Sequence, residues 1–379
     1  MSASATPARK YWLDNLRWVT VLLVLLYHVF YFYNNKGVFG GIGGFGEWPQ
    51  VKQYQDVVMY ILYPWFMPLL FLVAGISAYY ALAHHSGREW FRSRTRKLLV
   101  PGTIGLFVFH WMTGYFNTAV AARTGVFAGM PAVAKYMMMA VSGTGPLWFI
   151  QDLWLFSLLL LLIRKLDASG RFHDACGRVF GGKAGILWLV LLGVLFWLGE
   201  QTLIQNPRPE SPDGLLNLYK PLFYLIPFLL GYFVFSNEAV QEQVGKYWIP
   251  LLACAAVAGV VLIVTTFGQD NTSPHYLGSP LNCLYGWLAC LAMMAWFKAR
   301  FDRTSTFAGY MTRSSFGIYI VHYLVIASLG YMMKQYTQLP PWAMYVILAA
   351  AVFTLSPLLY EILRRIPFIR LCVLGEKKR

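Results

Sequence analysis

The stretch that decides the fold lies near the start of the chain: Tyr11-Trp12-Leu13-Asp14-Asn15-Leu16-Arg17, then ten mostly apolar residues, then His28. The apolar run around it, over 13–33, is long enough to cross a hydrocarbon core about 30 Å thick. At a rise of about 1.5 Å per residue, Arg17 and His28 stand about 16 Å apart along a helix. Arg17 is therefore expected at one membrane face and His28 near the middle, where an ionisable side chain usually marks a site.

The composition of the whole chain agrees with this first segment. Of 379 residues, 58% are hydrophobic and 12% are charged, about half the charge of a soluble domain. The mean hydropathy is +0.52, and apolar runs of nearly twenty residues recur along the whole length. We therefore predict an all-α fold, a polytopic membrane helical bundle in which 1–379 form a single transmembrane domain with no appended soluble domain.

The apolar runs predict about ten transmembrane helices. An even number of spans places both termini on the same side of the membrane. The expected spans are 13–33, 56–83, 98–117, 146–165, 184–204, 218–236, 248–267, 280–299, 314–333 and 342–363.

The net charge of +15 is better explained by membrane topology than by nucleic-acid binding. With the N-terminus in the cytoplasm, the cytoplasmic segments hold most of the 31 Lys and Arg residues, as the positive-inside rule requires. Both termini are therefore expected in the cytoplasm. The protein should be an integral, multi-pass protein, of the cytoplasmic membrane if its source is bacterial.

Two patterns that resemble functional motifs have simpler explanations. The five cysteines show no CxxC or metal-ligand spacing, so we interpret them as packing residues and expect no metal site. The run Gly41-Ile42-Gly43-Gly44-Phe45-Gly46 matches GxGxxG by letter. No strand precedes it and no βαβ unit surrounds it, so we expect an external loop rather than a dinucleotide site.

The first helix carries the strongest candidate for catalysis. A neutral imidazole at His28 can act as a general base, because the ordinary pKa of histidine lies near neutrality. Asp14 precedes Arg17 by three positions on the same helical face and can hold it in place. The simpler interpretation is an arginine that reaches the membrane surface and a histidine that hydrogen-bonds a neighbouring helix.

These residues also carry a family resemblance. Leu13-Asp14-Asn15-Leu16-Arg17 followed by His28 resembles the first-helix signature of the acyltransferase-3 family of integral membrane acyltransferases. Four later segments resemble further family motifs and occur in the same order. They are 71–77 (FLVAGIS), 98–101 (LLVP), 145–150 (GPLWFI) and 314–322 (SSFGIYIVH).

The resemblance implies transfer of an acyl group, commonly acetyl from acetyl-CoA, to a hydroxyl of a carbohydrate or another small acceptor. It implies that His28 is the catalytic residue and Arg17 its essential partner. Acetyl-CoA or another acyl-CoA would be a co-substrate, with no permanently bound cofactor. Direct transfer and an acyl-enzyme route remain open, as does an amine in place of the hydroxyl.

A basic run before the third span is the candidate donor site. Arginine forks bind phosphate in bidentate geometry, and CoA carries phosphates. The positive-inside rule accounts for the same charges without a ligand. The four residues are Arg92, Arg94, Arg96 and Lys97.

Several polar residues at mid-membrane depth could line one chamber with His28. His322 and His110 lie about 13 Å and 19 Å beyond the nearest basic residues at the inner face, and Tyr319 shares a helical face with His322. Trp148 and Asp152 come early in the fourth span, and Asp152 could orient a histidine, bind an acceptor hydroxyl or pair with a basic residue. The alternative for the three histidines is three separate helix–helix hydrogen bonds.

A transporter or exporter of a small polar solute is the competing function, because intramembrane His, Asp and Arg also occur in transporters. Such proteins often consist of two related halves with broken helices. The sequence shows no such internal symmetry, and the five ordered motifs favour the enzyme.

Overall fold

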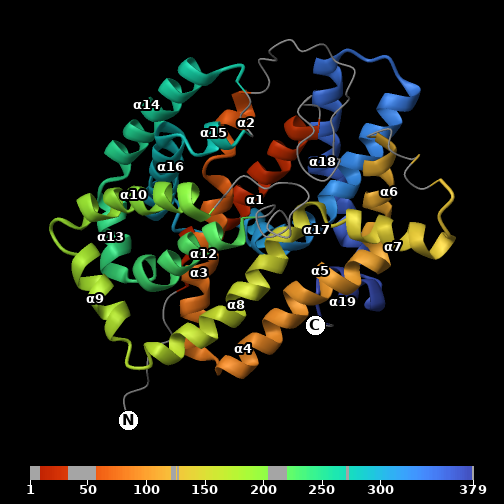
Figure 1. Ribbon diagram of the computed structural model, residues 1–379. Helices are drawn as coiled ribbons and strands as arrows, with labels where there is room; N and C mark the ends of the chain where they lie inside the picture. The colour runs from red at the N-terminus through yellow and green to blue at the C-terminus, as the bar shows by residue number, and fades with distance from the viewer. Residues whose placement is uncertain are drawn as a thin grey trace.

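The structure is a computed structural model that describes residues 9–32, 57–120, 125, 128–203, 220–269 and 273–377. Within these ranges every regular element is a helix, which confirms the predicted all-α membrane bundle (Figure 1). Nine helices in the described part are long and apolar enough to cross a membrane, or ten if one bent pair is counted as a span. The glycine-rich run 41–46, predicted to be an external loop, lies outside the described residues.

Eight spans contain one long helix each, and most follow the predicted runs closely. The longest of these helices is α17, which has 31 residues and carries His322. The eight are α1 (Tyr11–Phe32), α3 (Phe66–His84), α8 (Trp148–Leu166), α10 (Gly185–Leu203), α14 (Trp248–Thr266), α16 (Pro280–Arg300), α17 (Thr306–Tyr336) and α18 (Pro341–Leu363).

Other spans are broken or bent, which the hydropathy of the sequence does not predict. A short helix α2 (Val57–Leu62) precedes α3 across the turn that contains Pro64. The third span is assembled from α4 (Gly87–Arg94), α5 (Val100–Gly105) and α6 (Trp111–Val120), with π-helical stretches between them. The sixth predicted span is α12 (Pro221–Leu230) with its π-helical extension, which bends by 99° into α13 (Glu238–Lys246).

Four short helices complete the described chain: α7 (Ala132–Ser142), α9 (Arg171–Phe180), α15 (Pro274–Leu277) and α19 (Pro367–Leu374). None of them was predicted. The apolar helix α7 has 11 residues, too few to cross a hydrocarbon core, so the span count missed it.

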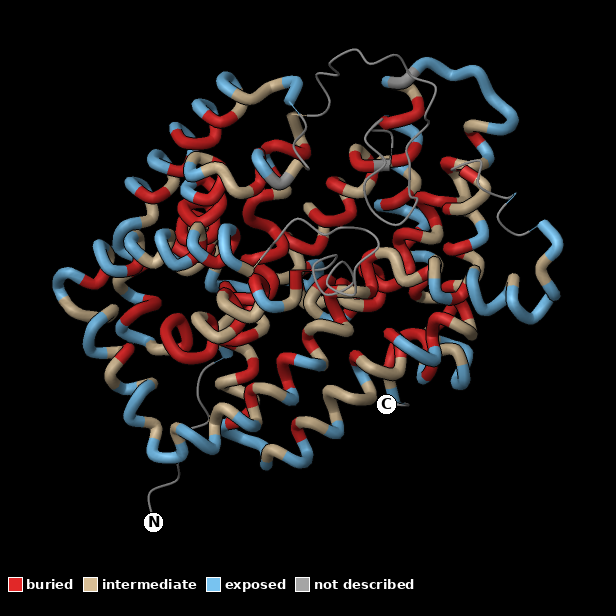
Figure 2. The backbone as a smooth tube through the Cα atoms, in the orientation of Figure 1, coloured by how far each residue is buried: buried red, intermediate tan, exposed pale blue. Residues whose placement is uncertain are grey.

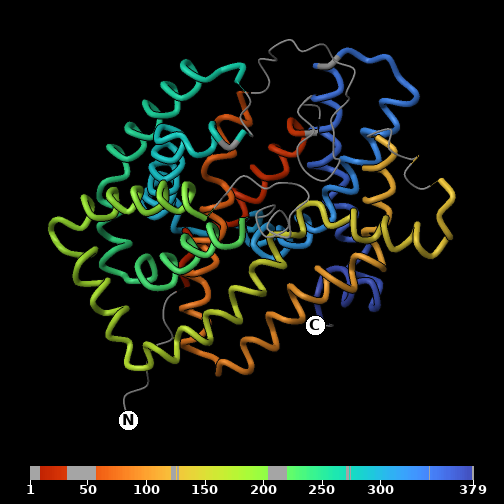
Figure 3. Tube along the Cα trace, viewed as in Figure 1, coloured from red at the N-terminus to blue at the C-terminus, as the bar shows by residue number. Residues whose placement is uncertain are grey.

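The first helix forms the centre of the bundle. It contacts α3, α16, α17 and α18, and Leu16, Leu25 and Val29 on it are completely buried (Figure 3). The outward faces of α10, α14 and α18 instead expose large apolar side chains such as Leu187, Val264 and Val346 (Figure 2). Apolar side chains on an outer face suit contact with lipid, as a membrane bundle requires.

Two glycines bring the backbones of α3 and α12 close together. A Cβ at Gly75 would lie 2.0 Å from the carbonyl oxygen of Phe228, and one at Gly231 would lie 2.1 Å from that of Leu72. Small residues at such crossings allow transmembrane helices to approach closely. The contact fixes α3, which contributes to both cavities described below.

The two described ends of the chain meet at one face of the bundle. Near the start, the Trp12 amide donates to Asp302 at 3.0 Å, just past the end of α16. Arg17 and Lys377, near opposite ends of the chain, line a single cavity. This agrees with the prediction of both termini on one side.

Candidate functional site

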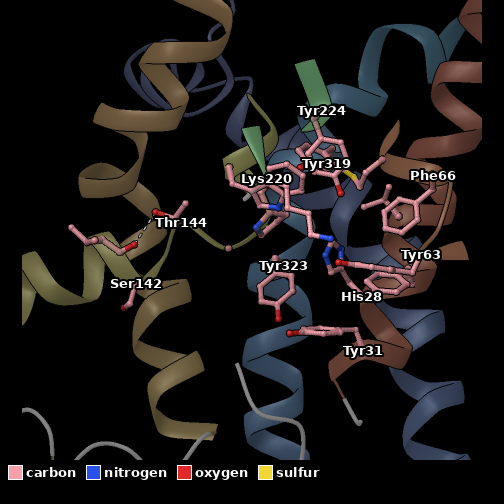
Figure 4. Close-up of a pocket in the computed structure, with 17 residues that line it drawn as sticks. His28, Tyr31, Tyr63, Phe66, Ser142, Thr144, Lys220, Tyr224, Tyr319 and Tyr323 are labelled. Carbon is pink, nitrogen blue, oxygen red and sulfur yellow. Dashed lines mark hydrogen bonds between the residues drawn. The ribbon is translucent and has the colours of Figure 1, made fainter. Parts of the chain in front are cut away.

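His28 lies in a cavity of about 160 Å³, here called the aromatic chamber (Figure 4). Its walls come from α1, α3, α12 and α17, and from the segment that joins α7 to α8. Aromatic rings dominate the lining, which comprises Val24, Tyr27, His28, Tyr31, Tyr63, Phe66, Met67, Val141, Ser142, Thr144, Gly145, Pro146, Trp148, Lys220, Tyr224, Tyr319 and Tyr323.

A second histidine holds His28 from the neighbouring helix. The Nε2 of His322 lies 3.0 Å from the Nδ1 of His28, and the Nδ1 of His322 lies 2.5 Å from the backbone carbonyl oxygen of Tyr319. His322 is completely buried. We expected His28 and His322 to line one chamber, but His322 is absent from the chamber lining. The two histidines instead form a direct hydrogen bond between α1 and α17.

These contacts determine which ring nitrogens carry hydrogen in the neutral pair. A carbonyl oxygen can only accept, so the Nδ1 of His322 must be the donor in its bond to Tyr319. The Nε2 of neutral His322 then has no hydrogen and accepts from the Nδ1–H of His28. The His28 ring also makes a backbone hydrogen bond with Val24. In this tautomer the Nε2 of His28 carries no hydrogen, which is the form that a general base requires.

Aromatic rings and one ion pair enclose the histidine. The Tyr323 ring stands edge-on to the His28 ring with centroids 5.3 Å apart, and Tyr27 lies edge-on at 5.6 Å. Lys220 lines the chamber and donates to Glu200 at 3.0 Å, and both side chains are buried. The chamber therefore combines flat apolar faces with a small number of polar groups, as small-molecule sites usually do.

A second cavity of about 520 Å³, here called the basic cavity, opens at the face where the two described ends meet. One carboxylate, Glu376, stands in its lining among positively charged side chains. The cations are Arg17, Arg94, Arg96, Lys97, Arg313 and Lys377.

Most of these cations have no carboxylate partner among the described residues. Arg17 is the exception, because its guanidinium lies 3.3 Å from Asp14 and 3.4 Å from the Ser77 hydroxyl. Arg94 lies over the Trp90 ring at 5.2 Å. The buried Nε of Arg96 has no hydrogen-bond partner in the described part of the chain. Unpaired guanidinium groups in a cavity are suited to bind a polyanion.

Local backbone structure explains why these cations converge. A π-helical turn at Thr95–Leu99 carries Arg96 and Lys97, and such turns are frequent at functional sites. Gly375 ends α19 with a φ of +64° and packs against this turn: a Cβ there would lie 2.6 Å from the Arg96 carbonyl oxygen. The segment after α19 thus forms a wall of the basic cavity.

The structure places the predicted residues in three groups. Trp148 and Tyr319 line the aromatic chamber with His28, and His322 hydrogen-bonds His28. Arg94, Arg96 and Lys97 line the basic cavity, and so does Arg17. Asp14 pairs with Arg17, as predicted, and with Arg9 at 2.8 Å.

Five predicted residues are absent from both cavity linings: Asp14 and His322, whose contacts are given above, and Arg92, His110 and Asp152. Arg92 is exposed, because at 100° per residue it points about 200° away from Arg94 on the same helix. His110 is buried in the π-helical stretch Leu106–His110 and is absent from the chamber lining. Asp152 also misses both linings, and its Oδ2 is buried with no hydrogen-bond partner in the described ranges.

Sequence reasoning missed Lys220, Arg313 and the segment 374–377. Arg313 served the positive-inside rule and the estimate of the depth of His322 but was not a candidate site residue. Lys220 was among the few basic residues assigned to the outer side. The tyrosines of the chamber come from four separate elements, so no spacing along the chain could reveal them. Tyr31, Tyr63 and Tyr323 lie around His28 in Figure 4.

The chain is similar to known proteins over nearly its whole length. A family model described as "Acyltransferase domain" matches residues 10–361. "Glucans biosynthesis protein C" from Shigella dysenteriae serotype 1 and the protein of the same name from Escherichia coli K12 are each 20% identical to this chain over 380 residues. These matches cover 97% of this chain and 95% of each relative. No solved structure matches the chain.

Proposed function

This chain belongs to the acyltransferase-3 family, and from that premise and the two cavities we propose that it moves an acyl group from acyl-CoA to a hydroxyl. The protein is a multi-pass integral membrane acyltransferase. In our proposal the donor is acetyl-CoA or another acyl-CoA, and the acceptor is a carbohydrate or another small molecule. The arrangement of a basic cavity that meets the His28 chamber carries the proposal.

The basic cavity supports the choice of donor. CoA carries phosphates at one end and the thioester at the other, and guanidinium groups favour phosphate. Arg94, Arg96, Lys97 and Arg313 hold the phosphates, while Arg17 contributes a further positive charge from α1. Since Arg17 lies in this cavity and not beside His28, the geometry favours donor binding as its role.

The aromatic chamber supports the choice of acceptor. Tyrosine and tryptophan rings offer flat apolar faces to a sugar ring, and Lys220, held by Glu200, offers a hydrogen-bond donor to its hydroxyls. The printed name of the two relatives connects them with the biosynthesis of glucans. That similarity, weak as an identity but extended over the whole chain, favours a carbohydrate.

The proposed reaction uses the free lone pair of His28. The acceptor hydroxyl gives its proton to the Nε2 of His28 as its oxygen attacks the thioester carbonyl carbon. The C–O bond forms and the C–S bond breaks, and the thiolate takes the proton from His28 to leave as CoA thiol. His322 holds the Nδ1–H of His28 and stabilises the imidazolium, as an orienting group does in a catalytic triad.

The experiment uses purified protein in nanodiscs, labelled acetyl-CoA and a pool of candidate sugars. Wild type should label an acceptor, and His28→Ala should lower kcat by about 10²- to 10⁴-fold, the usual contribution of a general base. Arg96→Gln should raise the KM for acetyl-CoA about 10-fold or more through loss of a charged hydrogen bond. Arg92→Gln is the matched control, because Arg92 lies outside the cavity.

Two results would contradict the proposal. If His28→Ala matches wild type, the histidine is structural. If wild type neither turns over nor binds acetyl-CoA, the donor is wrong.

A further inference from the structure

The two cavities meet at one side chain. Tyr319, on α17, lines both the aromatic chamber and the basic cavity, and only 2% of its surface is exposed. In the proposed reaction, an acyl group that enters through the basic cavity must reach His28 in the chamber. The thioester arm of the donor therefore has to pass the position that Tyr319 fills.

Several contacts keep Tyr319 in this position. Its hydroxyl donates to the backbone carbonyl oxygen of Pro146, in the segment that enters α8. Its ring packs edge-on against Phe149, which also lines the basic cavity, with centroids 5.8 Å apart. The side chain is thus anchored at its tip by one hydrogen bond and along its ring by aromatic packing.

The same residue supports the catalytic pair through its backbone. The Tyr319 carbonyl oxygen accepts from the Nδ1–H of His322, which in turn holds His28. Because the carbonyl belongs to the helix, it stays in place when the side chain rotates about its χ1 and χ2 angles. The side chain can therefore open and close without disturbing the hydrogen bonds that prepare His28.

We propose that the Tyr319 side chain is a gate between donor and acceptor cavities, and that it decides whether the acyl group meets the acceptor or water. This inference rests on the proposed function. With the gate closed, the hydroxyl bonds to Pro146 and water in the chamber cannot reach a thioester in the basic cavity. With the donor arm inserted, the hydroxyl leaves Pro146 and bonds instead to an amide carbonyl of that arm, so no buried hydroxyl is left unpaired.

The first test needs no turnover. Ser142, in the chamber lining, is changed to Cys in a Cys254→Ser background, because Cys254 is the exposed cysteine and the other four are buried. A membrane-impermeant thiol reagent is added to vesicles at the face of the basic cavity. Labelling should be slow with Tyr319 present, about 3- to 10-fold faster with Tyr319→Phe, which loses one neutral hydrogen bond, and faster still with Tyr319→Ala.

The matched control is Tyr310→Phe, which removes a hydroxyl from the same helix at a position outside both cavities. It should label at the rate of the parent. Equal labelling of the parent and of Tyr319→Phe would overturn the gate, whatever donor the enzyme uses. Should Tyr319→Ala fail to fold, the conservative Phe variant still decides the question.

The second test measures the fate of the acyl group. CoA release without an acceptor reports hydrolysis, and the labelled acceptor reports transfer. Tyr319→Phe should raise the ratio of hydrolysis to transfer by about 3- to 10-fold. An unchanged ratio would contradict the gate even if acetyl-CoA proves to be the donor, whereas absence of any turnover in wild type would count against the proposed function alone.

Discussion

At the scale of single residues, the hydrogen bond between His28 and His322 joins two helices almost 300 positions apart in the chain. Sequence could place both histidines near mid-membrane by counting helical rise from the nearest basic residues. It could not show that they touch, nor that the Tyr319 carbonyl fixes the tautomer. Those facts depend on how α1 and α17 are rotated against each other, which a period of 3.6 residues leaves undetermined.

His322→Phe should lower kcat by about 10²-fold or more while leaving the KM for acetyl-CoA within about twofold, because the ring no longer orients His28. The donor site, which is built from other residues, should be unaffected. Steady-state kinetics with labelled acetyl-CoA would check this. A rise in KM at constant kcat would show that His322 serves the donor and not His28.

Asp152→Asn should leave transfer activity unchanged and raise the melting temperature. The buried Oδ2 of Asp152 has no hydrogen-bond partner in the described chain, and an amide costs less to bury than an unpaired carboxylate. Activity and thermal unfolding in the same detergent would be compared. Loss of activity at an unchanged melting temperature would give Asp152 a catalytic or binding role.

At the scale of helices, the sequence predicted where the chain crosses the membrane better than how each crossing is shaped. The predicted count of about ten spans is consistent with the nine found in the described part, or ten with the bent pair, and several boundaries agree within a few residues. The π-helical turns at Thr95–Leu99 and Leu106–His110 and the 99° bend before α13 leave no mark on hydropathy. Arg96 and Lys97, on the first π-helical turn, line the basic cavity, whereas His110, on the second, is absent from the chamber lining.

Gly75→Ala or Gly231→Ala should destabilise the bundle by about 1–3 kcal/mol, since the new methyl would collide with backbone of the facing helix. Gly309→Ala is the matched control: its Cβ would meet only the end of the Arg313 side chain at 3.6 Å, and alanine favours a helix. Thermal unfolding in one detergent would rank the three. Equal melting temperatures would show that α3 and α12 can separate at no cost.

At the scale of the whole molecule, two chemically different cavities are separated by one side chain, that of Tyr319. The basic cavity opens at the face where the described ends of the chain meet, and the aromatic chamber lies deeper, around His28. The positive-inside rule assigned the basic face to the cytoplasm from sequence alone. The tyrosines that line the chamber, and the participation of 374–377 in the other cavity, required the three-dimensional arrangement.

Acetyl-CoA should support transfer only when it is added at the face of the basic cavity. Sealed vesicles of the two orientations, given membrane-impermeant acetyl-CoA on the outside, would test this. Inside-out vesicles should be active and right-side-out vesicles inactive until they are permeabilised. Equal activity before permeabilisation would place the donor entrance elsewhere.

Gly375 and Glu376 line the basic cavity, and their late position in the chain has a consequence for biosynthesis. The basic cavity takes Arg17 from α1 and part of its lining from the segment 374–377, which follows α19. The described helices between these two segments must therefore be synthesised and packed before this cavity is complete. A prematurely terminated polypeptide, even with His28 already in the bilayer, would lack part of the cavity that we propose to bind the nucleotide end of acyl-CoA.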